Sequence, residues 1–194
     1  MKRSLTLALA LLLASIHFAA TAEVTVRVAH QDNAFQVEAM LLVAVEQRLA
    51  WQVLTDYDNL AGFVPGMRSS RIVSRAGEPL LLEQKGESGL LLFKVPIEVV
   101  SRIDEAPFDT IGFQSVGGTL KNQTGQWALD RHDHATRVSY RANITPGFPL
   151  PPFIGPAIVG RDVRVMVDSV GREMLRRSVA IGQGGPTPVI PAGR

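Results

Sequence analysis

Cysteine is absent from this chain of 194 residues, and histidine is scarce, with four in all. Without cysteine the protein can form no disulfide, no thiolate nucleophile and no thiolate metal site. His132 and His134 could offer two nitrogens to Zn²⁺, but no third ligand is evident, and the trio His132-Asp133-His134 is typical of a hairpin turn. Glycine-rich loops that bind dinucleotides or nucleotide phosphates are missing as well. We therefore expect neither a metal nor a cofactor.

Net charge is nearly lacking too. The chain has 20 Lys and Arg residues against 18 Asp and Glu residues. Lys2 and Arg3 lie within the first 22 residues, which contain no acidic residue, so the remainder balances at 18 against 18. A neutral chain has no electrostatic footprint for nucleic acid or for an anionic membrane surface. We therefore expect no nucleic-acid partner.

Long hydrophobic runs are lacking after residue 20. The one run, residues 4–20, follows Lys2 and Arg3 and leads into Ala20-Thr21-Ala22. This order of basic, apolar and small residues is typical of a secretory signal peptide, and the run is short for a spanning helix, which needs about 20 residues. We predict that residues 1–22 are a signal peptide cleaved after Ala22, and that the protein is exported to the periplasm. A retained membrane anchor is the alternative.

What the rest of the chain contains is mostly β-structure. Residues 24–30 and 35–45 alternate apolar with polar side chains around a turn-like Gln31-Asp32-Asn33, which predicts two strands joined as a hairpin. Six further strand-like runs follow, separated by turn signals roughly every ten residues, which favours an antiparallel meander. The predicted runs cover residues 70–74, 80–85, 90–103, 108–115, 124–130 and 136–144.

Three segments have helical spacing instead. Residues 47–55 form the first, and Leu60, Phe63, Val64 and Met67 predict a second that follows Asp58 as N-cap and is stopped by Pro65-Gly66. The longest runs from Ala157 to about Val179 and contains Gly160 and Gly171, which indicate a close approach or a bend. The predicted class is α+β, with helices packed on one face of a curved antiparallel sheet. Residues 23–180 would form this domain, and the Gly/Pro-rich residues 181–194 a disordered tail.

The stretch LTDYDNLAGFVPGM, residues 54–67, concentrates polar side chains in an apolar chain. Asp56 and Asp58 are two residues apart at a predicted helix junction, where aspartate normally caps backbone N–H groups. A catalytic carboxylate pair is the alternative, but spacing alone does not predict a shared pocket. Tyr57 and Phe63 suit either the core or the mouth of a cavity.

Large apolar side chains recur from this stretch to the last helix. They suit an ordinary core, or equally a ligand cavity, because such cavities are mostly apolar with a few polar groups. The candidate cavity residues are Tyr57, Phe63, Met67, Phe93, Val95, Phe113, Trp127, Phe148, Phe153, Met166 and Val170.

Four segments carry a family resemblance: VAVEQRLAWQVLTDYDNLAGFVPGMRSSRIV, LLFKVPIEVV, GGTLKNQTGQWAL and PPFIGPAIVGRDVRVMVDSVGREMLRR. In them the chain resembles the START-like helix-grip superfamily (SRPBCC), in its polyketide cyclase/dehydratase and coenzyme Q-binding branch, over about residues 35–178. The resemblance implies a curved sheet gripping a long C-terminal helix, two short helices at one end, and a hydrophobic cavity between them. One departure is Glu46, where relatives usually carry proline.

From this resemblance we expect a binding protein that holds a hydrophobic small molecule of the lipid, quinone or polyketide-like class. Transient contact with a membrane is compatible with that role, and the oligomeric state stays open. The alternative is a cyclase or dehydratase acting on a similar ligand, for which Asp56, Tyr57, Glu83 and Glu98 are the candidate acids and bases. A domain with a collapsed cavity and a structural role is a third class.

Overall fold

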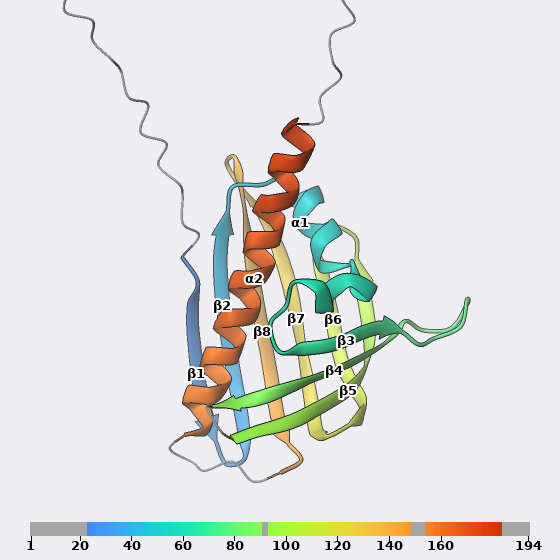
Figure 1. The fold of residues 1–194 in the computed structure, drawn as a ribbon, viewed down its shortest axis with the longest axis vertical. Helices are drawn as coiled ribbons and strands as arrows, with labels where there is room; N and C mark the ends of the chain where they lie inside the picture. Colours follow the sequence, from blue (N-terminus) through green and yellow to red (C-terminus); the bar gives the residue numbers. More distant parts are fainter. Residues whose placement is uncertain (1–22, 91–92, 149–153, 184–194) are drawn as a thin grey trace, which may run out of the picture.

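The protein is described here by a computed structural model that covers residues 23–90, 93–148 and 154–183. The predicted signal peptide and residues 184–194 lie outside the described residues. Within them the chain forms one curved, fully antiparallel sheet and a long helix that lies along its concave side (Figure 1). The predicted α+β class with a helix gripped by a curved sheet is confirmed.

The sheet has eight strands in the described part of the chain, in the order β1-β2-β8-β7-β6-β5-β4-β3. The strands from β3 to β8 are neighbours in chain order, so the predicted meander is confirmed, and the hairpin β1–β2 adds beside β8. Figure 1 shows β3, β4 and β5 running at a steep angle to β2, β8 and β7, with β4 ending beside the beginning of the long helix. The strand bounds are β1 Thr25–Gln31, β2 Ala34–Val43, β3 Met67–Ile72, β4 Leu81–Leu90, β5 Phe93–Ala106, β6 Thr110–Gly118, β7 Leu120–His132 and β8 Ala135–Pro146.

Alternation along the strands decides which side chains enter the core. In β2, Phe35, Val37 and Leu41 are each 1% exposed, while Met40 and Leu42 on the other face are almost half exposed. Because cross-strand partners share a face, Trp127 opposite Tyr140 also points to the concave side. The concave side of the sheet is therefore the apolar side, as the period of two predicts.

Three helical segments cover the concave side. Helix α1, Gln47–Leu54, and helix α2, Gly155–Gln183, occupy the first and last predicted helical segments. Because α2 continues to Gln183, the first residues of the predicted disordered tail are helical. Between α1 and the sheet, the side-chain amide of Gln47 donates to the carbonyl oxygens of Phe108 (2.7 Å) and Leu129 (2.9 Å). These bonds fix α1 across one end of the sheet.

The second predicted helix was wrong in type, although its predicted stop at Pro65-Gly66 is confirmed. The structure has a 3₁₀ helix, η1, over Tyr57–Gly62, and Met67 begins β3 instead of completing a helical stripe. Gly66 has a positive φ of 83°, so the chain turns at Pro65-Gly66 before it can make another helical turn. The predicted capping by aspartate was wrong too: no side-chain cap bond is made at Asp56, and Asp58 accepts from the backbone N–H of Ile72 at 3.0 Å.

Gly160 and Gly171 of α2 lie where the helix approaches the sheet closely. A close approach was one of the two explanations predicted for these glycines, and a bend was the other. A Cβ atom on Gly171 would lie 2.5 Å from Cδ2 of Leu41, and one on Gly160 would lie 3.2 Å from Cγ2 of Val28. The backbone of the helix therefore packs directly on side chains of β1 and β2. This contact leaves the cavity space on the other side of α2, toward β3 to β7.

Candidate ligand-binding cavity

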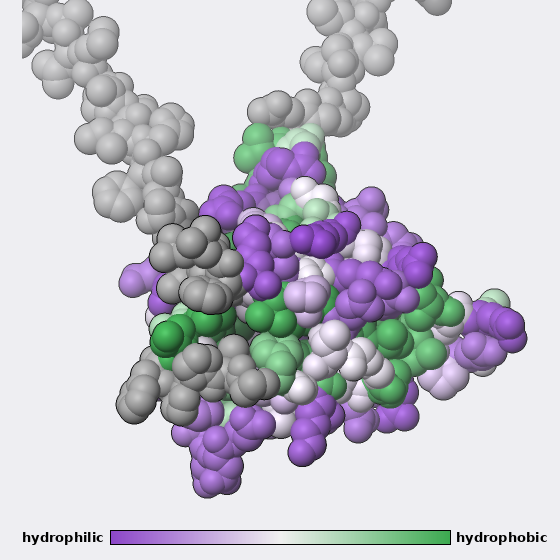
Figure 2. Space-filling view, turned by 60° about the horizontal axis from the view of Figure 1, so that its bottom comes forward, coloured by the Kyte–Doolittle hydropathy of each residue, from purple (hydrophilic) through white to green (hydrophobic). Residues whose placement is uncertain are grey.

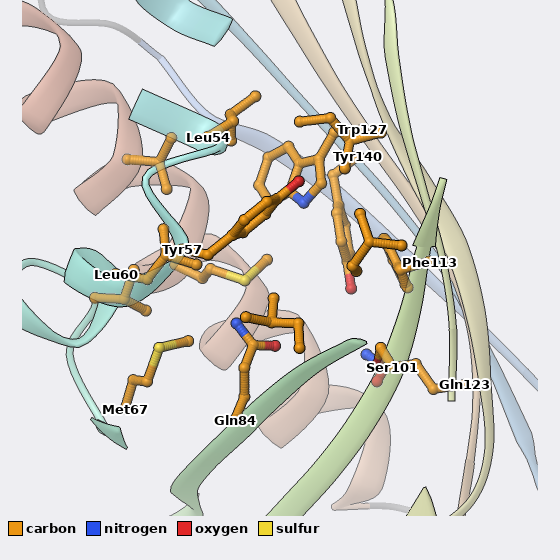
Figure 3. A pocket seen from close by; sticks show the side chains of 16 residues that line it. Leu54, Tyr57, Leu60, Met67, Gln84, Ser101, Phe113, Gln123, Trp127 and Tyr140 are labelled. Atoms are coloured by element: carbon orange, nitrogen blue, oxygen red, sulfur yellow. The ribbon is translucent and has the colours of Figure 1, made fainter. Parts of the chain in front are cut away.

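A cavity lies between α2, η1 and the concave face of the sheet. Its deeper part, here called the inner chamber, has a volume of about 110 Å³ (Figure 3). The inner chamber is lined by Leu54, Tyr57, Leu60, Val64, Met67, Leu82, Gln84, Ser101, Ile103, Ile111, Phe113, Gln123, Trp127, Tyr140, Met166 and Val170. None of these is Asp, Glu, His, Lys or Arg.

A second space, the outer chamber, continues from the first toward the beginning of α2. It has a volume of about 250 Å³ and is bounded by β4, β5, the end of β8 and the first turns of α2. Both chambers share six lining residues, which we call the neck: Val64, Met67, Gln84, Gln123, Tyr140 and Met166. A molecule that moves between the chambers therefore passes two amides and a phenol.

The entrance to the outer chamber is polar. The Ser88 hydroxyl of β4 donates to Oδ2 of Asp162 in α2 at 2.6 Å, which bridges the entrance. Glu87 beside it is paired with Lys94 and Arg68, and these contacts, Lys94 first, lower the pKa of its carboxyl. Figure 2 looks at this end of the molecule and shows apolar surface set between hydrophilic patches.

Two phenols face the inner chamber, and neither ionises readily. Burial raises the pKa of Tyr57 well above its usual range, and its hydrogen bond to Oε1 of Glu105 (2.5 Å) raises it further. Burial also raises the pKa of Tyr140 to about 12, against the opposing effect of a hydrogen bond with Gln123. At neutral pH both hydroxyls are therefore neutral hydrogen-bonding groups.

Aromatic rings hold Tyr140 in place. The ring of Trp127 lies tilted against it with centroids 4.7 Å apart, and Phe113 stacks on it at 5.8 Å. These three side chains come from three neighbouring strands and form the aromatic wall of the inner chamber (Figure 3). Such ring pairs fix the position of a hydroxyl more firmly than area burial alone would.

The predicted cavity residues fall into four groups. Six of them line the inner chamber and one lines only the outer chamber; two line neither, and two cannot be placed because their side chains lie outside the described residues. The residues of the inner chamber are Tyr57, Met67, Phe113, Trp127, Met166 and Val170, and the residue of the outer chamber is Phe148. Phe63 and Val95 line neither chamber, and Phe93 and Phe153 are the two that cannot be placed. Phe63 instead faces α2, where the guanidinium of Arg177 lies 5.8 Å from the centre of its ring.

The carboxylates proposed as acids and bases stand outside the chambers. Asp56 binds Asn59 and Arg177, and these contacts, Asn59 first, lower the pKa of its carboxyl. Glu83 pairs with Arg71 at 2.9 Å, and Glu98, on the exposed side of β5, lies 3.6 Å from Lys85. None of the three carboxylates lines either chamber.

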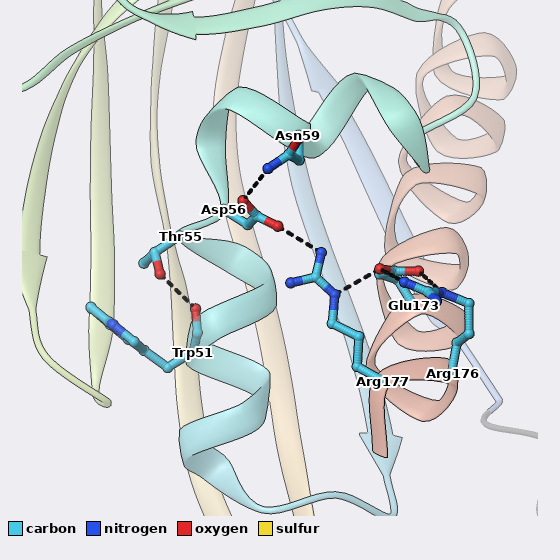
Figure 4. A network of polar contacts seen from close by, with 7 residues as sticks. All are labelled: Trp51, Thr55, Asp56, Asn59, Glu173, Arg176 and Arg177. Carbon is cyan, nitrogen blue, oxygen red and sulfur yellow. Dashed lines mark hydrogen bonds and ion pairs between the residues drawn. The ribbon is translucent and has the colours of Figure 1, made fainter. Parts of the chain in front are cut away.

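Asp56 belongs to a charged cluster that joins η1 to α2 (Figure 4). Arg177 donates to Oδ2 of Asp56 and to Oε1 of Glu173, each at 2.7 Å. Arg176 binds the same Glu173 through two nitrogens, and these contacts, Arg176 first, lower the pKa of Glu173 to about 2. Through Asp56, the stretch LTDYDNLAGFVPGM is thus attached to the end of the long helix.

The inner chamber contains four polar residues that the sequence did not lead us to predict. Gln84, Ser101, Gln123 and Tyr140 all line the inner chamber, and none was a candidate. Every second residue of a strand points to the same face. Gln84 lies two residues after the buried Leu82, and Ser101 lies two residues from each of the buried Val99 and Ile103, so both point inward. A polar residue in an inward position of a strand is the pattern that would have found them.

Three features of the described residues concern metal binding and membrane-spanning helices. Among the described residues, no cluster of three or more His, Asp or Glu side chains could hold a metal ion. His132 and His134 flank Asp133 at the tight turn between β7 and β8, as predicted, and Asp133 has a positive φ of 52°. No helix within the described ranges has the length and apolarity needed to cross a bilayer.

A curved antiparallel sheet, wrapped round one long helix with an apolar cavity between them, defines the helix-grip class of START-like proteins. The family model for polyketide cyclase / dehydrase and lipid transport matches residues 43–170, and the chain belongs to this family. No curated protein matches the chain in sequence.

Solved structures with the same fold are distant in sequence. The Zhui aromatase/cyclase from Streptomyces sp. R1128 has 19% identity and a TM-score of 0.66, with 77% of this chain and 98% of that chain covered. A STAR-related lipid transfer protein from Xanthomonas axonopodis has 13% identity and a TM-score of 0.63, with coverage of 81% and 95%. At these identities the likeness establishes the fold alone.

Proposed function

We propose that this protein is an exported, non-catalytic binding protein that holds a hydrophobic small molecule between the sheet and α2. The observation that carries the proposal is the lining of the inner chamber, where apolar side chains predominate and every polar side chain is neutral at pH 7. Burial of apolar ligand surface there would contribute about 25 cal/mol per Å². The family to which the chain belongs includes lipid transport in its description, which agrees with this role.

The test is native mass spectrometry of the protein purified from the envelope of its own cells, followed by organic extraction. We expect a co-purifying lipid, quinone or related apolar molecule. Val170→Phe places a larger side chain in the inner chamber and should reduce the occupied fraction, whereas Leu42→Gln on the exposed face of β2 should leave it unchanged. A ligand-free protein whose melting temperature no apolar compound shifts would contradict the proposal.

Export is a separate part of the proposal and rests on the pattern of residues 1–22. The full chain, expressed in a bacterium and recovered by osmotic release of the periplasm, should begin at Glu23 when its intact mass is measured. A protein that keeps Met1 and sediments with the membrane would support the anchor reading instead.

A cyclase or dehydratase is the second candidate. Two phenols and two amides converge on the cavity, and one solved structure with this fold is an aromatase/cyclase. At neutral pH the raised pKa values of Tyr57 and Tyr140 keep both phenols protonated, so they can donate a hydrogen bond and do not act as a base. Incubation with a β-hydroxy ketone distinguishes the two functions: loss of water that depends on Tyr140 supports the enzyme, and unchanged substrate supports the carrier.

A further inference from the structure

Two side chains in the inner chamber have hydrogen-bonding capacity that the protein does not use. The Ser101 hydroxyl is almost fully buried, at 3% exposure of the residue, and the Gln84 amide is partly buried at the neck. Among the hydrogen bonds found within the described residues, neither of these side chains takes part. Polar groups so placed are expected to have a partner, since leaving them unpaired is unfavourable.

A third group lies beside them. The hydroxyl of Tyr140 shares a hydrogen bond with Gln123, and an hydroxyl can both donate and accept, so it keeps capacity for a further partner. Figure 3 shows Gln84, Ser101, Gln123 and the hydroxyl end of Tyr140 toward one part of the cavity, with Leu54 toward another. Tyr57 differs from this group, because its hydroxyl is already bound to Glu105.

The groups that remain are all neutral, and this restricts the ligand. An ionised carboxylate or phosphate in the inner chamber would lose its hydration without meeting a cation, since no Lys, Arg or His lines that chamber among the described residues. A pure hydrocarbon would leave Gln84 and Ser101 unpaired. A ketone, ester or hydroxyl oxygen carried on an apolar skeleton avoids both costs.

We infer that Gln84, Ser101 and Tyr140 form a subsite that selects apolar ligands bearing a neutral oxygen function over unsubstituted hydrocarbons and over ionised ones. This inference rests on the proposed function and names the chemistry of its ligand. Because Gln84 and Tyr140 line both chambers, the oxygen would sit at the neck, between the part of the ligand in the inner chamber and the part nearer the entrance.

The test compares three probes of one skeleton, menadione, methylnaphthalene and naphthoate, by isothermal titration calorimetry. Menadione carries two neutral carbonyl oxygens, and the chain has no cysteine that this quinone could alkylate. We expect menadione to bind about tenfold more tightly than methylnaphthalene, and naphthoate more weakly than either, because one good hydrogen bond in a buried site is worth about this factor.

Gln84→Met and Ser101→Ala should each reduce the preference for menadione about three- to tenfold without weakening methylnaphthalene. Gln126→Met, on the opposite face of β7, is the matched control and should change nothing. Equal binding of menadione and methylnaphthalene to the unmodified protein overturns this inference and leaves the proposed function standing. Unchanged preference in both variants also overturns it. Failure of all three probes to bind also overturns this inference, and the co-purification experiment then decides the proposed function separately.

Discussion

Tyr57 and Tyr140 are the chain's two tyrosines, and both line the inner chamber. Burial is the first cause of the raised pKa in each, so both phenols favour the neutral form when the protein is folded. A raised folded-state pKa contributes stability that is fully present below the ordinary value of about 10 and is lost as the pH rises through the folded value. The free energy of unfolding should therefore fall as the pH rises from about 10 toward 12.

This gives a prediction that ultraviolet titration can check. In the folded protein no phenolate absorbance should appear near pH 10, and Tyr57→Phe should leave a single transition at about 12, from Tyr140. Protein unfolded in guanidinium chloride, as the control, should titrate near pH 10. Appearance of phenolate near pH 10 in the folded protein would show that one ring is exposed.

At the residue scale the sequence could predict the apolar part of the site and not its polar part. Met67, Phe113 and Trp127 were predicted because large apolar side chains on alternate positions usually face inward. Gln84 and Ser101 were missed because, in strand patterns, a neutral polar residue usually marks the solvated face. Phe63 was a cavity candidate as well, but its ring lies beside Arg177. Because these two residues are far apart in sequence, no local pattern could reveal their contact.

At the scale of elements, α2 contributes to every part of the site. Asp162 lies at the entrance, Met166 at the neck, Val170 in the inner chamber, and Glu173 with Arg177 in the cluster that holds η1. These positions follow one another at three or four residues, so they share one face of the helix. Loss of the cluster should release η1 from α2.

Glu173→Gln should therefore lower the free energy of unfolding by about 1–3 kcal/mol, since it weakens charged hydrogen bonds to two arginines. Urea denaturation measures the change. Asp168→Asn is the matched control: it removes an exposed i,i+4 pair with Arg172 on the same helix and should cost less than about 0.5 kcal/mol. A similar loss of stability in both variants would mean that the cluster stabilises the fold no more than an exposed ion pair does.

The same cluster predicts an acid dependence. The pKa of Glu173 is lowered to about 2 from an ordinary value near 4.5, so its stabilising effect is present above 4.5 and is lost as the pH falls toward 2. Melting temperature should decline over this range, and Glu173→Gln should show a smaller decline. An equal decline in the variant would assign the acid sensitivity to other carboxylates.

Gly171 allows a test of how closely α2 lies on β2. Gly171→Ala should lower stability by about 1–3 kcal/mol, because its Cβ would overlap the fully buried side chain of Leu41. Gly160→Ala, with more room, should be neutral or stabilising by up to about 1 kcal/mol through helix propensity. Combination of Gly171→Ala with Leu41→Ala should be less costly than the sum of the two, and additivity would contradict the close contact.

Most elements could be predicted because their periods are long and regular, as in α2 and in the strands β5 to β8. Boundaries shifted by a few residues, which is usual where backbone hydrogen bonds, and not side-chain pattern, decide the end of an element. The segment after Tyr57 was misassigned because Leu60, Phe63, Val64 and Met67 have helical spacing, although Pro65 and Gly66 break the helix between them. The pairing of β2 with β8 brings together residues about a hundred positions apart, beyond what local pattern can indicate.

At the scale of the whole molecule, the two chambers and the polar entrance follow one another from η1 to the start of α2. Of the contacts at the entrance, the bond from Ser88 to Asp162 joins β4 directly to α2. We expect this bond to break when the entrance opens. Ligand exchange should therefore depend on it more strongly than ligand affinity does.

Ser88→Ala should raise the association and dissociation rates of menadione together, by about 2- to 10-fold, which is the factor that one hydrogen bond supplies. Stopped-flow measurements give both rates. Ser139→Ala, on the outer face of β8, should leave them unchanged. If dissociation alone changed, Ser88 would be a ligand contact and not part of the entrance.

The packing of Trp127 against Tyr140 gives the protein a built-in optical reporter. Trp51 and Trp127 are its two tryptophans, and only Trp127 lines the inner chamber, while Trp51 of α1 packs against Phe108. Fluorescence emission from Trp127 should thus respond to a ligand in the cavity, and emission from Trp51 should report whether the protein is folded. A single tryptophan-to-phenylalanine change separates the two signals, so occupancy can be followed without any attached dye.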